Sequence, residues 1–409
     1  MNVQSMLPHS SASEYSLRRP LLAHPTTVFF VVWAMTLALA ACGWIPIFAQ
    51  YASTAVLVGV LLITSNLLGA AFASITVRQP RRPHKGCLRY RGRALIFRVW
   101  VVISLVEIGF AGGLPVIWLL TGSGRTYEDF GIHTVHGLAN GLWIFLAFTQ
   151  CLRIFDRACR RRDRQLALAL LVWPILMMSR ALITILLLQV VSFYLITTMR
   201  RMRSVLLRLS VLVVIFALAF GYMGDVRAPD FSIVEALGFD SDQTRSTALL
   251  WIYSYIVSPV STLALNWEIS IPEFTLLPFN TLANLLPSVA RSALSMGTGF
   301  DSYIGVLAHD AFNVSTAFLA PFLDWGPAGM LVMAFVIGFI GHVVWCAALR
   351  NALKLPLLSA YDAFVALTIF TNQFTQLMPL LLLVMLTYLA RRPRVRRVET
   401  RVQPTPSLS

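Results

Sequence analysis

Charged residues are scarce in this sequence. They make up 12% of the 409 residues, whereas hydrophobic residues make up 57% and the mean hydropathy is +0.72. A soluble domain carries about 25% charged residues, because its surface must be solvated. The shortage of charge therefore excludes a soluble domain and indicates a membrane protein. Apolar runs of about 18 to 25 residues, which can cross about 30 Å of hydrocarbon, recur along the chain and predict several membrane spans.

Cysteine is scarce, and the common catalytic motifs are absent. The five cysteines have no metal-ligand spacing, which argues against both a zinc site and a disulfide framework. The sequence contains no glycine-rich phosphate loop, no dinucleotide-binding fingerprint, no His-x-x-Glu-His motif and no serine nucleophile elbow. We therefore expect neither a cofactor nor a bound metal.

Ten apolar runs predict helices in the membrane, two or three of them short. They are residues 28–48, 54–77, 99–120, 135–153, 166–178, 181–198, 205–222, 327–349, 357–371 and 377–390. Only helices and closed barrels satisfy their backbone groups in lipid, and the alternating pattern of a barrel is absent. The sequence thus predicts an all-α polytopic integral membrane protein with about ten transmembrane helices.

Basic residues are divided unequally between the predicted loops. With a cytoplasmic N-terminus, all but five of the 33 Lys and Arg residues fall in cytoplasmic segments. The net charge of +15 is therefore read as an orientation signal and not as a nucleic-acid-binding surface. One helix over 166–198 would place four arginines outside, so we expect a hairpin of two short helices that turns at Ser179–Arg180.

These spans divide the chain into four predicted parts. Residues 1–222 form a membrane bundle with seven helices, and residues 223–326 form a large external loop with interfacial helices. Residues 327–390 return to the membrane, and residues 391–409 form a basic cytoplasmic tail. The external loop is the part with room for a site, because it is rich in acidic residues, prolines and aromatic-rich apolar runs.

Three arginines outside the cytoplasmic segments are candidate anion-binding groups. Arg180 heads the apolar run RALITILLL, where an arginine costs about 2.5–3.5 kcal/mol unless it snorkels or meets an anion. A guanidinium suits a phosphate because it donates two parallel hydrogen bonds. Arg245 begins a run that we expect to lie as an interfacial helix along the outer face; alternatively it is a solvated charge opposite Asp240 and Asp242. Arg291 precedes a glycine-rich stretch that could wrap a ligand.

The interfacial run also carries aromatic side chains. Trp251, Tyr253 and Tyr255 can stack on sugar rings. Anchoring in the aromatic belt of the membrane explains the same residues without any ligand.

The stretch HDAFNVSTAFLAPFLDWGPAG holds the acid–base candidates. Histidine titrates near neutrality and a neighbouring carboxylate can tune it, so His309 and Asp310 are the predicted catalytic pair. A surface histidine beside a capping aspartate is the alternative. Asn313 and Thr316 also fit helix capping, and Asp324 fits the start of a helix with Pro327 in its first turn.

Two further carboxylates lie inside predicted spans. Glu107 falls within 99–120 and Asp362 within 357–371, so each must find a partner or water. A transport role for these two carboxylates is the alternative to a structural one.

The combined pattern resembles the bacterial O-antigen and capsular repeat-unit polymerases of the Wzy type. The resemblance covers the helix count with both ends inside, the arginine of SRALITILLL, the large outer loop, and FNVSTAFLAPFLDWGPAG running into a span. Its closest local match consists of Asn313, Thr316, Asp324, Gly326 and Gly329.

The resemblance implies a GT-C-like, metal-independent glycosyltransferase of the bacterial inner membrane. Such an enzyme polymerises undecaprenyl-pyrophosphate-linked oligosaccharide repeat units at the periplasmic face, in O-antigen or exopolysaccharide biosynthesis. The implied partners besides this substrate are membrane lipid, a chain-length regulator and a flippase, with no nucleic acid. The implied pyrophosphate-binding residues are Arg180, Arg245 and Arg291, His309 or Asp310 is the base, and the other substrate-binding residues are Asn313, Thr316, Asp324, Tyr253 and Tyr255.

Two alternatives stay open. O-antigen ligases share the long outer loop and a histidine before the next span, a pattern that His309 and Asn313 also fit. A lipid-linked oligosaccharide flippase would carry polar residues along several spans, whereas most spans here are nearly bare of charge.

Overall fold

The fold is built almost entirely from helices. The computed structural model describes residues 24–77, 89–90, 92–125, 129–132, 134–154, 161–198, 207, 210–211, 232–239, 247–274, 276–286, 305–309 and 312–391. Seven helices in these ranges are long and apolar enough to cross a membrane. The predicted all-α, multi-pass membrane architecture is therefore confirmed, whereas the count of ten helices and the four chain parts stay predictions.

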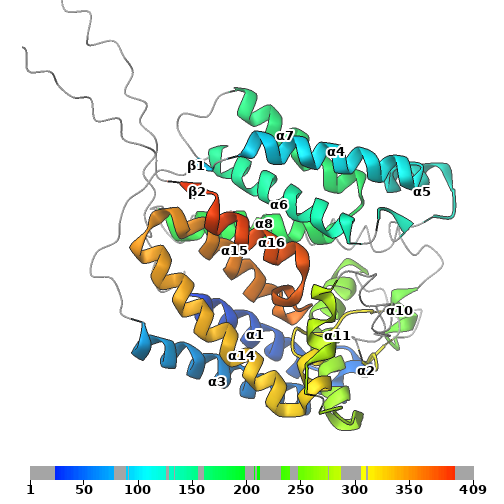
Figure 1. Cartoon of the computed structure of the whole chain (residues 1–409). Helices are drawn as coiled ribbons and strands as arrows, with labels where there is room; N and C mark the ends of the chain where they lie inside the picture. The colour runs from blue at the N-terminus through cyan, green and yellow to red at the C-terminus, as the bar shows by residue number, and fades with distance from the viewer. Residues whose placement is uncertain are drawn as a thin grey trace, which may run out of the picture.

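The helices are packed side by side over most of the molecule (Figure 1). The longer ones are α1 (Pro25–Ala41), α3 (Ala52–Thr76), α4 (Arg93–Ala111), α6 (Val135–Ile154), α7 (Arg161–Leu176), α8 (Arg180–Thr197), α11 (Thr247–Ile269), α14 (Leu319–Arg350), α15 (Leu355–Ala366) and α16 (Leu377–Tyr388). The shorter ones are α2 (Pro46–Ala49), α5 (Pro115–Thr121), α10 (Ile233–Ala236), α12 (Phe279–Leu282) and the 3-10 turns η3 (Ala283–Leu285), η5 (Ala352–Lys354), η6 (Leu367–Ile369) and η7 (Gln373–Thr375). Most of the predicted span 205–222 lies outside the described residues.

Helices α3 and α14 approach each other closely through small residues. A Cβ atom added at Gly69 would collide with the carbonyl oxygen of Phe335, and one added at Gly338 would collide with that of Asn66. The amide of Asn66 donates to the carbonyl of Ala334 at 3.1 Å. In lipid the hydrophobic effect does not drive helices together, so close packing of their backbones must supply the attraction. Glycine is needed at these positions because a side chain would prevent this close packing.

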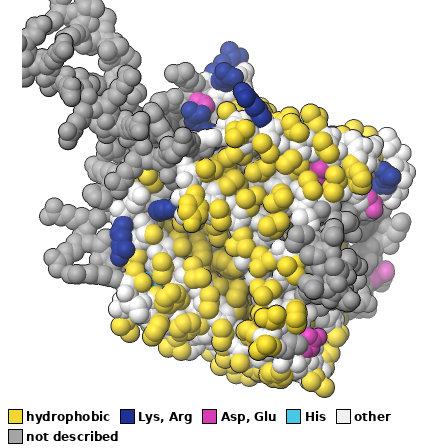
Figure 2. Space-filling view, viewed as in Figure 1, with side chains coloured by type: hydrophobic (Ala, Val, Ile, Leu, Met, Phe, Trp, Pro, Cys, Tyr) yellow, Lys and Arg dark blue, Asp and Glu magenta, His cyan; other side chains and the backbone are white. Residues whose placement is uncertain are grey.

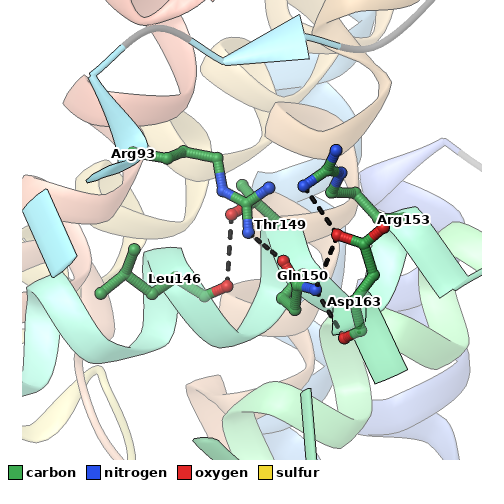
Figure 3. Close-up of polar contacts among 6 residues, drawn as sticks. All are labelled: Arg93, Leu146, Thr149, Gln150, Arg153 and Asp163. Carbon is green, nitrogen blue, oxygen red and sulfur yellow. Dashed lines mark hydrogen bonds and ion pairs between the residues drawn. The ribbon is translucent and has the colours of Figure 1, made fainter. Parts of the chain in front are cut away.

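Segments that the basic residues assign to the cytoplasm meet at one end of the bundle. Strands β1 (Arg89–Tyr90) and β2 (Ala390–Arg391) pair antiparallel there, which joins the segment before α4 to the C-terminal segment. Figure 3 shows Arg93 donating to Gln150, whose amide donates to the carbonyl of Asp163 at 2.6 Å. The Asp163 carboxylate in turn pairs with Arg153 at 2.9 Å. These contacts tie the ends of α4, α6 and α7 together.

Basic and acidic side chains also gather toward different ends of the bundle. On the face drawn in Figure 2, hydrophobic side chains cover the middle of the molecule and most Lys and Arg side chains gather toward the end that carries the strands. Most Asp and Glu side chains on this face lie toward the opposite end. This separation follows the positive-inside distribution of a multi-pass membrane protein.

The predicted break at Ser179–Arg180 is confirmed. Helix α7 ends at Leu176, Met178 adopts a left-handed conformation (φ 51°), and the Ser179 hydroxyl caps α8 by accepting from the amide of Leu182. A serine N-cap satisfies one of the free amides at a helix start, so the sequence itself encodes the restart at Arg180.

The predicted start at Pro327 appears as a break inside α14. Trp325 and Gly326 leave the helical region there, with φ/ψ of −137°/20° and 60°/−149°. Proline has no amide to donate and fits the first turn of the following helix. The helical turns before the break, from Leu319, were not predicted.

Helix α11 runs across one end of the bundle (Figure 1). The Tyr253 hydroxyl donates to the carbonyl of Leu39 at 2.7 Å, near the end of α1. Thr54, near the start of α3, donates to the Glu268 carboxylate at 2.6 Å. Leu39 and Thr54 lie on either side of the same connection, so both halves of α11 contact the same end of the bundle. We call it the α11 end. Helix α11 is also one of the seven helices that are long and apolar enough to cross a membrane, so the interfacial position expected from the sequence stays a prediction.

Candidate functional site

Two predicted site residues meet at the α11 end. The guanidinium carbon of Arg180 lies 5.6 Å from the ring centroid of Tyr255, and Nη2 lies 3.4 Å from the Tyr255 hydroxyl oxygen. A cation over an aromatic face is attracted by the negative face of the ring. The contact therefore links the first residue of α8 to α11, and the two residues in contact are 75 positions apart in the sequence.

An aromatic ring connects this pair to His309. The ring of Phe312 contacts Tyr255 edge-on at 5.7 Å between centroids, and its centroid lies 5.8 Å from that of His309. Phe312 is buried, with 1% of its surface exposed. We call Arg180, Tyr255, Phe312 and His309 the arginine–tyrosine cluster. The rings of Tyr255 and Phe312 thus connect the guanidinium of Arg180 to the imidazole of His309.

Helix α11 also fixes the segment that carries His309. The side-chain amide of Asn266 accepts from the backbone amide of Val306 at 3.0 Å and donates to the Val306 carbonyl at 2.7 Å. The backbone amide of Ala308 donates to the Thr262 hydroxyl at 3.2 Å. A side chain that bonds both backbone groups of one residue sets its position closely, so His309 is held by the same helix as Tyr255.

Tyr253 is occupied by structural contacts. Besides donating to the Leu39 carbonyl, its hydroxyl accepts from the backbone amide of Trp44 at 3.2 Å. The side chain is buried. These contacts give Tyr253 a packing role inside the protein, and both sugar stacking and anchoring in the membrane belt stay predictions.

Asp324 holds two chain segments together. Its Oδ1 accepts from the backbone amide and the side chain of Asn280 at 2.9 and 3.0 Å. Its Oδ2 accepts from the backbone amide and the hydroxyl of Thr281 at 2.8 and 2.7 Å. Four hydrogen bonds use the acceptor capacity of a carboxylate, and Asp324 is fully buried. It therefore ties α12 to α14, and this arrangement leaves it no oxygen for the predicted substrate contact.

The remaining predicted residues divide between exposed, buried and undescribed positions. Asn313 is exposed next to Phe312, whereas Thr316 is buried and its hydroxyl accepts from the amide of Phe318 at 3.3 Å. Phe318 is the N-cap of α14, so this bond lies in the turn before the helix and does not cap it. Asp310, Arg245 and Arg291 lie outside the described residues.

Sequence reasoning missed a second acid–base pair. Glu107, fully buried on α4, lies 3.3 Å from the Nδ1 atom of His136 at the start of α6. The backbone amide of Ile132 donates to the same carboxylate at 3.3 Å. A carboxylate bonded to one ring nitrogen fixes the tautomer and leaves the other nitrogen for proton exchange. The buried glutamate was the available signal, because it had to find a partner.

Clusters of the side chains that usually bind transition metals are not found in the described part of the chain. Within it, no group of three or more His, Cys, Asp or Glu side chains lies close enough to hold an ion. At the end of the bundle opposite α11, His24 and His342 are in contact, with 3.1 Å between Nε2 and Nδ1. Burial, together with the neighbouring His342, lowers the pKa of His24 to about 4.

The comparisons with known proteins add no relative to this geometry. No protein-family model matches the chain, and no curated protein and no solved structure matches it either. The candidate site therefore rests on the arginine–tyrosine cluster and its position at the α11 end of a multi-pass membrane protein.

Proposed function

We propose that this protein is a metal-independent, GT-C-like glycosyltransferase of the bacterial inner membrane. In this proposal it polymerises oligosaccharide repeat units carried on undecaprenyl pyrophosphate, with its site on the periplasmic side and both termini in the cytoplasm. The observation that carries the proposal is the contact between Arg180 and Tyr255 at the α11 end.

The position of Arg180 suits a lipid-borne pyrophosphate. It heads an apolar helix, next to the aromatic side chains of α11, an arrangement that is typical of headgroup depth. A guanidinium donates five N–H bonds in a fixed fork and is always charged, so it stabilises a phosphate anion without a metal.

The proposed reaction needs a base and an anion-stabilising group. A hydroxyl of the incoming unit attacks the anomeric carbon of the growing chain, and the bond from that carbon to the pyrophosphate oxygen breaks. The pyrophosphate leaves with the electron pair and is stabilised by Arg180. The hydroxyl proton passes to His309 or Asp310. In the structure the ring of Phe312 contacts both His309 and Tyr255, so the proposal places the substrate beside this ring.

The gel ladder of surface polysaccharide tests the proposal. A strain without the protein is complemented with the wild type, Arg180→Ala, Arg180→Lys or Arg125→Ala. Arg125 is the matched control, because it also lies over an aromatic ring, 5.4 Å from Trp118, but outside the cluster. We expect Arg180→Ala to lose the ladder, Arg180→Lys to restore part of it, and Arg125→Ala to keep it.

The same gel separates the alternatives. A single repeat unit on the lipid A core in the strain without the protein supports a polymerase. Loss of every repeat, with polymer left on the lipid carrier, supports an O-antigen ligase. The position of His309 before a span is the observation that favours this alternative. Unpolymerised units on the inner face support a flippase. A full ladder with Arg180→Ala overturns the assignment of Arg180.

A further inference from the structure

A carboxylate is buried between α8 and α15. Asp362 is 2% exposed and lies within the predicted span 357–371. The hydroxyl of Ser192 donates to its Oδ2 atom at 2.9 Å. The other oxygen, Oδ1, is buried and has no hydrogen-bond partner among the described residues.

A glutamine faces the same helix contact. Gln189 is fully buried on α8, one turn before Ser192, and neither its amide nitrogen nor its amide oxygen has a partner in the described ranges. Its backbone carbonyl accepts from the hydroxyl of Ser359 at 2.8 Å, and Ser359 lies one turn before Asp362 on α15. We call Gln189, Ser192, Ser359 and Asp362 the α8–α15 polar seam.

The seam is surrounded by apolar side chains. Leu186 and Phe193 flank it on α8, and Leu358 and Phe364 flank it on α15; all four are buried. The ion pairs found between described side chains involve Glu107 and Asp163 but not Asp362. An unpaired ionised carboxylate in such surroundings is strongly unfavourable, and each unpaired buried amide group adds about 1–3 kcal/mol. The seam therefore requires a positive charge that the described side chains do not supply.

We propose that the α8–α15 polar seam binds a single positive charge, either Na⁺ or a proton, that neutralises Asp362. For Na⁺, the ligands are the free oxygens of Asp362 and Gln189 and the hydroxyls of Ser192 and Ser359. For a proton, Asp362 Oδ1 becomes a hydroxyl that can donate to the Gln189 amide oxygen. The site is independent of the proposed glycosyl transfer, although α8 carries Arg180 at its other end.

Thermal unfolding of the full-length protein in lipid nanodiscs tests this site. The wild type, Asp362→Asn and Glu268→Gln are compared in NaCl and in KCl at equal ionic strength. The Glu268→Gln variant is the matched control, since it removes a carboxylate at the exposed α11 end that accepts a hydrogen bond from the Thr54 hydroxyl. A ligand that binds the native state raises the melting temperature, so Na⁺ should raise that of the wild type and the control by about 2 °C or more. Asp362→Asn should lose this dependence.

A pH series from about 5 to about 9 covers the proton. If the native state holds a proton that the unfolded state releases, stability falls as pH rises, and Asp362→Asn should flatten this fall relative to Glu268→Gln. The two series thus tell the two charges apart. The proposal is overturned if the stability of the wild type and the control neither rises with Na⁺ nor falls between about pH 5 and about pH 9. That outcome needs only the wild type and the control, and Ser192→Ala offers a milder second variant where Asp362→Asn does not fold.

Discussion

Tyr255 contacts Arg180 with both its ring face and its hydroxyl, 5.6 Å and 3.4 Å from the guanidinium carbon and Nη2 respectively. The two contacts can be separated by substitution. Tyr255→Phe keeps the ring and removes the hydroxyl, whereas Tyr255→Ala removes both. A cation–π contact that is partly desolvated contributes about 1–2 kcal/mol. In the polysaccharide ladder assay we therefore expect Tyr255→Phe to shorten chains slightly and Tyr255→Ala to lose most of the polymer. Equal ladders for the two variants would show that the ring does not position Arg180.

The Glu107–His136 pair should act as one unit in stability. His136→Ala leaves a fully buried carboxylate without its side-chain partner, which costs about 3 kcal/mol in the free energy of unfolding. Glu107→Gln combined with His136→Ala removes the buried charge as well, so the double variant should melt above the single His136→Ala variant. Thermal unfolding of the purified chains measures both. If the stability loss of the double variant equals the sum of the losses in the two single variants, the pairing is contradicted.

The close contact of α3 and α14 predicts a position-specific effect of one methyl group. Gly338→Ala places a Cβ against the carbonyl oxygen of Asn66 and should lower the free energy of unfolding by about 1–3 kcal/mol. Gly109→Ala is the matched control, since a Cβ at Gly109, also inside a helix, meets nothing within 4 Å. This control should be neutral or more stable by about 1 kcal/mol, because alanine favours the helix. The melting temperatures of the two variants provide the comparison, and a similar change in both would contradict the close contact.

The His24–His342 contact predicts a loss of stability in acid. The pKa of His24 is lowered from 6.5 to about 4 in the folded chain, so the unfolded chain binds the proton more readily between these values. Its contribution is therefore present above about pH 6.5 and is lost as the pH falls toward 4. His24→Asn keeps a capping side chain before α1 and removes the titration, so its melting temperature should fall less steeply between pH 7 and pH 4. Parallel curves for variant and wild type would exclude this contribution.

Local features of the fold were predictable from local sequence. The restart of a helix at Arg180 is encoded by the Ser179 cap, and the break before Pro327 is encoded by a glycine and a proline in succession. Such signals act within one turn of helix. The position of α11 was not predictable to the same degree, because its aromatic, apolar run is typical of an interface but is also long and apolar enough to cross a membrane.

Contacts between distant segments were not predictable in the same way. The Arg180–Tyr255 contact spans 75 residues and depends on how α11 crosses the bundle. Asp324 resembled a helix-start residue, but its four partners come from Asn280 and Thr281, more than forty positions earlier. His136 was overlooked since a histidine in an otherwise apolar run has no local signature, and only its neighbour Glu107 marks it.

The four hydrogen bonds of Asp324 have a consequence for the chain that precedes α12. They fix one end of residues 271–282, and the amide of Glu273 donates to the carbonyl of Leu323 at 2.9 Å near the other end. This stretch carries six large apolar side chains that point out of the molecule, namely Ile271, Phe274, Leu276, Leu277, Phe279 and Leu282. Because hydrogen bonds already hold the backbone at Glu273, Asn280 and Thr281, placing these side chains in the hydrocarbon of one leaflet would cost less conformational entropy. Asp324 thus helps to fix an exposed apolar surface through which the α11 end can contact the bilayer.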